Sequence, residues 1–285
     1  MGNTPAESYF GVSIAISGTT VAVGAPDNDV YNMTGDAANF HGDGVVLLYN
    51  CPLVAGAYSC APSTVNLTCL PVLLADPTTA PSAAGYCNAS QFGYSVALAT
   101  MDGYLYLAVG APALDITVTS DSVPGCTDGM VVIYNCGPAA AATPTCTVIG
   151  SAGQLGSSLD ACTFFGSDLS IVVMSTTEFY VLVGSEMIGD IPWFHCNSSS
   201  CTVDSLSTGS SSLGDQTPFA IFSAVAATST LIAVTSLGSE NDDVYPGSYV
   251  FTMASAIARS YITPVAVMLE YDSTSTFTIL CSPSS

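Results

Sequence analysis

Acidic side chains are the first candidates for chemistry. Asp27 and Asp29 follow an apolar segment directly, and Asp36 lies close behind them. Carboxylate oxygens suit Ca²⁺, but a calcium loop also needs further oxygen ligands and a glycine that sharpens the turn. We therefore expect a solvated acidic loop, with Asp27, Asp29 and Asp36 as the remaining candidates for Ca²⁺, and no other cofactor.

Groups for acid–base and nucleophilic catalysis are sparse. Of the two histidines, His41 and His195, the second adjoins Trp193 in an apolar segment, which predicts a packed ring rather than a general base. No Gly-x-Ser-x-Gly turn is present for a hydrolase serine. Arg259 is the single Lys or Arg residue, which disfavours phosphoryl transfer. We predict that the chain is not an enzyme.

Eleven cysteines indicate an oxidising compartment. None has the Cys-x-x-Cys spacing of a zinc or redox site, so disulfides across hairpins are the expected use. Short spacings, and local guesses for the last two, predict the pairs Cys51–Cys60, Cys136–Cys146, Cys196–Cys201, Cys69–Cys87 and Cys126–Cys162. Cys281 is left for an intermolecular disulfide, a buried free thiol, or a partner on a longer chain.

Composition and sequons agree with an extracellular location. Asn-x-Ser/Thr sequons predict N-glycosylation at Asn32, Asn66, Asn88 and Asn197. A net charge of −21 excludes nucleic acid as a partner, because no basic patch can neutralise phosphates. The chain holds no apolar run long enough to span a bilayer, so we expect no membrane insertion. Polar residues follow Met1, so we expect a processed product or a piece of a longer chain.

Self-comparison of the sequence reveals a repeat that weakens along the chain. Each unit holds an aromatic start, two strand-like segments and, after a variable loop, a third. The starts are Phe10-Gly11, Phe92-Gly93, Phe165-Gly166 and Phe219-Ala220, and the second segments contain Val23-Gly-Ala-Pro26, Val109-Gly-Ala-Pro112, Val183-Gly-Ser185 and Val234-Thr-Ser236. Short β-branched segments bounded by Gly, Pro, Asp and Ser predict strands.

These units predict an all-β, propeller-like array of about four antiparallel blades, stapled by disulfides. We expect one domain over 1–285, with blades near 9–90, 91–163, 164–217 and 218–281; a β-sandwich is the alternative. Segments such as 13–16 (Ser-Ile-Ala-Ile) alternate small and large residues, so both faces of each sheet are expected to be covered.

Phe-Gly-x-Ser followed by Val-Gly-Ala-Pro resembles the FG-GAP repeat of integrin α-subunit propellers and related extracellular proteins. The resemblance is dense over 9–136, and beyond it only Phe165-Gly166 remains. It implies a propeller whose blades begin near each Phe-Gly and a role in adhesion. The family's Ca²⁺ loop between the first two strands does not transfer, because 17–20 and 100–104 lack its oxygen ligands.

The sequence therefore predicts an extracellular structural or adhesive glycoprotein module. It would act through protein–protein contacts, with copies of itself or other extracellular glycoproteins, in a cell-surface, sheath, appendage or filament assembly. Two alternatives stay open: a secreted hydrolase acting on glycans or phosphoesters, since 22 acidic residues allow many carboxylate pairs, and a soluble glycan- or ligand-binding module.

Overall fold

Strands and turns make up the part of the chain that the computed structural model describes, and it contains no helix. The described residues are 9–26, 44–67, 90–113, 129–141, 144–153, 164–185, 190–207, 222–236, 247–252, 266–269 and 279–281. Among them no helix is long and apolar enough to cross a membrane. The expected all-β class is confirmed.

Four antiparallel sheets follow one another in chain order. Sheet one consists of β1 (Ser13–Ser17), β2 (Thr20–Ala25), β3 (Val45–Asn50) and β6 (Ala61–Leu67), and sheet two of β7 (Ser95–Met101), β8 (Tyr104–Ala111), β9 (Met130–Pro138) and β10 (Thr147–Gly153). Sheet three consists of β11 (Leu169–Val173), β12 (Phe179–Val183), β13 (Asp190–Cys196) and β14 (Cys201–Ser207). Sheet four consists of β15 (Phe222–Ala227), β16 (Leu231–Ser236), β17 (Gly247–Thr252), β18 (Ala266–Leu269) and β19 (Ile279–Cys281).

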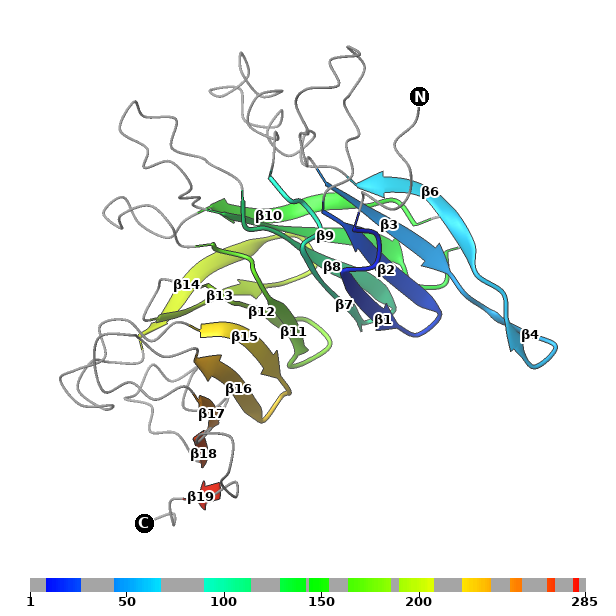
Figure 1. The fold of residues 1–285 in the computed structure, drawn as a ribbon. Coiled ribbons are helices and arrows are strands. Elements are labelled where there is room, and N and C mark those ends of the chain that lie inside the picture. Colours follow the sequence, from blue (N-terminus) through cyan, green and yellow to red (C-terminus); the bar gives the residue numbers. More distant parts are fainter. Residues whose placement is uncertain are drawn as a thin grey trace, which may run out of the picture.

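The sheets are arranged as the blades of an open propeller (Figure 1). Their first strands contact one another in the order β1, β7, β11 and β15. In the described residues the array does not close into a ring. Four successive sheets match the expected array of about four blades and not the two-sheet sandwich.

Each of the first three sheets opens with the same turn. The Val12 N–H donates to the Tyr9 carbonyl oxygen at 3.1 Å, and Tyr94 and Ser167 make the corresponding bonds in sheets two and three. The third residue of the turn has a positive φ, as at Gly11 (88°). A glycine meets this need without strain, which explains why Phe is followed by Gly in the motif.

Among the described residues, one hydrophobic core lies between sheets one and two and another between sheets two and three. In each core the first face of the later sheet, here called its leading face, carries large residues such as Phe92, Val96 and Leu107. The opposite face of the preceding sheet, its trailing face, carries small residues such as Ala15 and Ala22. Ala97 and Ala108 hold the same places between sheets two and three, but both trailing faces also carry large side chains, such as Leu48 in sheet one and Tyr106 in sheet two.

Close backbone contact completes the packing between sheets. A Cβ at Gly24 would overlap the carbonyl oxygen of Gly93, and a Cβ at Gly110 would overlap that of Gly166. The Ser13 hydroxyl donates to the same Gly93 oxygen at 2.7 Å. The motif residues Ser and Gly therefore form a notch that receives the Phe-Gly turn of the next sheet.

Candidate interaction surface

The leading face of sheet one is exposed along β1 and the turn before it, whereas Val23, which lies opposite Ile14 on the same face, is buried. Its exposed side chains come from the Phe-Gly turn and β1: Phe10 is 51% exposed, Val12 50%, Ile14 59% and Ile16 67%. Strand alternation puts Val12, Ile14 and Ile16 on one side, whereas Ala15 faces sheet two. A continuous apolar strip of this kind on a protein surface marks an interaction site.

The positions that correspond to Phe10 and Ile14 are buried in the next two sheets, whereas Tyr94, which corresponds to Val12, is 41% exposed. Phe92 and Phe165, which correspond to Phe10, are 0% exposed. Val96, which corresponds to Ile14, is 9% exposed. What buries them is the trailing face of the sheet before, through the parallel bridge of Phe92 with Gly44 and its counterpart at Phe165. Sheet one has no preceding sheet among the described residues, so its strip is left uncovered.

This exposure corrects one expectation from the sequence. The small–large alternation of residues 13–16 was expected to mean that both faces are covered. In sheet two that holds, because Val96 and Ala97 are both buried. In sheet one it is wrong for Ile14 and Ile16, since alternation shows that a face is apolar but not that a neighbour is present.

A second exposed apolar group lies on the hairpin that projects from sheet one (Figure 1). This hairpin, β4 (Leu53–Val54) and β5 (Ala57–Tyr58), turns at Ala55 and Gly56, both with positive φ. Leu53 and Tyr58 are exposed, and the disulfide Cys51–Cys60 closes the base of the hairpin. Its apolar residues occupy two short strands rather than a whole sheet face.

In the described part of the chain, three disulfides join directly opposed hairpin residues. They are the short-spaced pairs Cys51–Cys60, Cys136–Cys146 and Cys196–Cys201. The other expected partners, Cys69, Cys87, Cys126 and Cys162, lie outside the described residues. Cys281 ends β19 opposite Ala266, where only the backbone is described.

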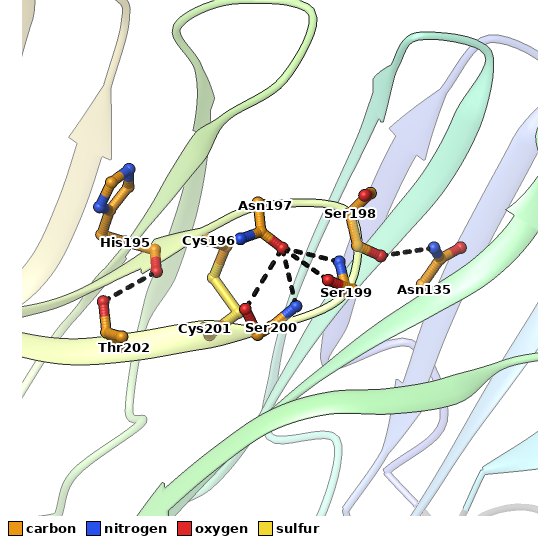
Figure 2. The surroundings of a disulfide bond; sticks show 9 residues. All are labelled: Asn135, His195, Cys196, Asn197, Ser198, Ser199, Ser200, Cys201 and Thr202. Carbon is orange, nitrogen blue, oxygen red and sulfur yellow. Dashed lines mark hydrogen bonds between the residues drawn. A yellow bond between two sulfur atoms is a disulfide. The ribbon is translucent and has the colours of Figure 1, made fainter.

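The Cys196–Cys201 hairpin fixes the one described loop that carries a sequon (Figure 2). The Asn197 Oδ1 atom accepts hydrogen bonds from the Ser199 and Ser200 N–H groups at 2.8 and 2.9 Å. These bonds occupy the carbonyl oxygen, while the residue itself is exposed. The Asn135 amide of sheet two donates to the Ser198 carbonyl oxygen at 3.0 Å, which holds the loop against that sheet.

The remaining sequons and metal candidates lie outside the described residues or in a strand of which only the backbone is described. Asn32 and Asn88 lie outside the described residues, as do Asp27, Asp29 and Asp36. Asn66 lies in β6, where only the backbone is described. In the described ranges no three His, Cys, Asp or Glu side chains gather as metal ligands. Calcium binding at the acidic loop stays an untested prediction.

His195 pairs with a carboxylate that the sequence did not single out. Its Nε2 atom lies 3.1 Å from Glu178 Oε2, and its ring stacks on Tyr180 at 4.7 Å between centroids. The expectation of a packed histidine holds only for one ring face, because the His195 side chain is 47% exposed. Register explains the pair: Tyr180 is opposite His195 in the β12–β13 ladder. His41 lies outside the described residues.

Burial, rather than a charged partner, dominates the electrostatics of the cores. Burial raises the pKa of the Tyr134 hydroxyl, which lies in the core between sheets one and two. Burial, and then the Glu178 carboxylate, raise the pKa of Tyr180. Both shifts favour the neutral phenol, although only Tyr134 lies in a hydrophobic core, while Tyr180 stacks on Trp193 and His195.

Residues 3–38 match the family model of the FG-GAP repeat. No curated protein matches the chain in sequence. The matched segment contains the Phe10-Gly11 turn and the Gly24 notch, so the resemblance seen in the motifs is confirmed for the first repeat. FG-GAP repeats mediate protein–protein interactions.

Sequence reasoning missed the leading face of sheet one as a surface. A usable signal was available, because residues 10–16 alternate large apolar and small residues and contain no charged side chain. The repeat pattern does not show which sheet covers which face. That information comes from the order in which the sheets stack.

Proposed function

We propose that the chain is an extracellular structural or adhesive glycoprotein module that acts through protein–protein contacts in a cell-surface, sheath, appendage or filament assembly. The observation that carries the proposal is the exposed strip Phe10, Val12, Ile14 and Ile16. The counterparts of Phe10 and Ile14 in sheets two and three are buried contact residues, so the strip has the chemistry of an interface. Disulfides, sequons and the FG-GAP repeat support the extracellular setting.

The test replaces the chain, in the cells that make it, by an Ile14→Asp/Ile16→Asp variant. We expect this variant to be secreted but lost from the insoluble extracellular assembly, since two charges would have to be desolvated in the contact. Leu53→Asp, an exposed apolar site on the β4–β5 hairpin, is the matched control and should be retained. Retention of the Ile14→Asp/Ile16→Asp variant at the wild-type level would overturn the proposal.

Mass spectrometry of the same material tests the extracellular setting that the proposed function assumes. Glycosidase treatment should lower the mass, and the peptide containing Asn197 should carry sugar. Reduction should also release the disulfides of the three hairpins. An unglycosylated chain with reduced cysteines, found inside the cells, would contradict the setting.

One observation favours the hydrolase alternative, namely the Glu178–His195 pair. Both side chains are more than two-fifths exposed on a sheet surface, where water screens their interaction. If the pair served acid–base catalysis, Glu178→Gln would abolish hydrolysis of a chromogenic ester or glycoside by the purified chain. We propose a non-catalytic role, for which wild type and Glu178→Gln show equal background rates.

A further inference from the structure

We propose that the occupant of the leading face of sheet one is sheet four of a second copy of this chain, so that copies associate head to tail. This inference rests on the proposed function and names its partner. It takes the packing inside the chain, in which large residues of a leading face meet paired alanines in the first two strands of the sheet before, and continues it between chains.

The first step is that the array has two different ends. At one end the leading face of sheet one exposes Phe10, Ile14 and Ile16. At the other end, Ile232 of β16 is 0% exposed, whereas its neighbour Leu231 is 42% exposed. Because adjacent residues of a strand point to opposite faces, Leu231 lies on the trailing face of sheet four, away from the buried side.

The second step is that sheet four repeats the alanine pair found on the trailing faces of sheets one and two. Ala15 pairs with Ala22 in sheet one, and Ala97 pairs with Ala108 in sheet two. In sheet four Ala226 pairs with Ala233, at the corresponding register. Sheet three has Ser170 opposite Leu182 instead, so the pattern returns at the last sheet.

The third step concerns charge. The strands at both ends, 13–25 and 222–236, contain no charged residue, although the chain carries a net charge of −21. Two copies therefore repel one another at long range but meet through uncharged strands at the contact. Repulsion of this kind is screened by salt, so association should strengthen as ionic strength rises.

The fourth step sets the strength of the contact. Gly24 and Gly110 let the next sheet's backbone approach closely, but register puts Thr235 at this position in sheet four. We therefore expect a contact weaker than those inside the chain and reversible. A contact between two different faces is heterologous, and it builds either a ring or a filament.

Sedimentation velocity of the purified, disulfide-bonded full chain tests the proposal. Wild type should form species larger than a dimer as concentration rises, and Leu53→Asp should behave like wild type. Ile14→Asp and Leu231→Asp should each weaken association by about ten-fold or more, as a charge in an interface core does. Circular dichroism confirms folding; Ile14→Thr and Leu231→Thr replace any variant that does not fold.

Mixing the two variants supplies the decisive result. An equimolar mixture of Ile14→Asp and Leu231→Asp should form a dimer and nothing larger, because each copy retains one intact face. If Leu231→Asp associates like wild type, or the mixture stays monomeric while wild type associates, the head-to-tail contact is wrong. A wild type that stays monomeric at all concentrations overturns the second copy as occupant.

The two proposals fail separately. Loss of Ile14→Asp/Ile16→Asp from the native assembly, with a purified chain that stays monomeric, would overturn the second copy and retain the interaction module. Association of the purified chain, with full retention of that variant in the assembly, would overturn the proposed function.

Discussion

At the scale of residues, the FG-GAP motif has a glycine where the backbones of neighbouring sheets touch. Gly24 and Gly110 lie where any Cβ would overlap the next sheet's carbonyl oxygen. Gly184, the third equivalent, would place a Cβ 3.0 Å from Asp168 of its own repeat. The requirement for glycine is therefore strict at the first two notches and looser at the third.

Gly110→Ala should destabilise the protein by about 3 kcal/mol, the upper end of overpacking costs, because the Gly166 backbone cannot yield as a side chain would. Gly103→Ala is the matched control. Unlike Gly110, it has a positive φ, 76°, but there is open space around it, so about 1–2 kcal/mol is expected from the backbone alone. Urea denaturation measures both free energies. A smaller loss for Gly110→Ala than for Gly103→Ala would contradict the notch.

Tyr134 makes the core between sheets one and two sensitive to alkali. Because burial raises its pKa in the folded state, the unfolded chain loses this proton first as pH rises. Stability is therefore complete below about pH 10, the ordinary tyrosine value, and falls by about 1.4 kcal/mol for each pH unit above it.

Tyr134→Phe should remove this part of the alkaline loss. Denaturant unfolding at a series of pH values from neutral to alkaline compares it with wild type and with Tyr58→Phe, whose parent side chain is 74% exposed. The Tyr58→Phe profile should follow wild type. Parallel slopes for wild type and Tyr134→Phe would show that the buried phenol does not control alkaline stability.

At the scale of elements, the hairpin disulfides stabilise the fold in different ways. Loop entropy alone ranks Cys51–Cys60 above Cys196–Cys201, at about 2.6 against about 2 kcal/mol, because its loop is longer. Packing reverses the order. A Cβ on Gly150 of β10 would lie 2.6 Å from Cys201 Cβ, so the second disulfide is seated against sheet two.

Cys196→Ala/Cys201→Ala should therefore cost more stability than Cys51→Ala/Cys60→Ala, by about 1 kcal/mol or more, since it also leaves a space under β10. Thermal and urea unfolding of both double variants measure the difference. Equal losses, or a larger loss at Cys51–Cys60, would mean that the disulfides act through loop entropy alone.

The starts of the sheets and the hairpin disulfides could be predicted from the sequence. The burial of individual strand residues could not, because it depends on the neighbouring sheet. Phe10, Phe92 and Phe165 mark the starts of three sheets, and cysteine spacing located the three hairpin bonds. The Ser13 and Ser95 segments have the same pattern, yet Ile14 is exposed and Val96 is buried. A repeat pattern fixes the face of a residue, but its burial depends on the neighbouring sheet.

The Glu178–His195 pair escaped prediction for a related reason. The two residues are 17 positions apart, and they meet only because β12 and β13 pair with Tyr180 opposite His195. Strand register is set by the whole ladder rather than by either residue, so the sequence does not show that Glu178 lies beside His195. The apolar neighbours of His195 alone predict a packed ring.

At the scale of the whole molecule, a rule of stacking connects fold and function. Sheets two and three bury their leading faces on the sheet before, whereas sheet one has an apolar strip and no preceding sheet among the described residues. The net charge of −21 makes copies of the chain repel one another at low salt. Association is therefore expected only where uncharged apolar strands, such as β1, meet.

Chemical footprinting of β1 tests this account most directly. Native extracellular assembly and chain released from it are labelled with a carbene reagent, and the modification of residues 9–17 is compared with that of 53–58. We predict strong protection of Phe10, Ile14 and Ile16 in the assembly and full labelling after release, with the β4–β5 hairpin less affected. Equal labelling of Ile14 and Ile16 in both states would contradict the claim that the leading face of sheet one is a contact surface.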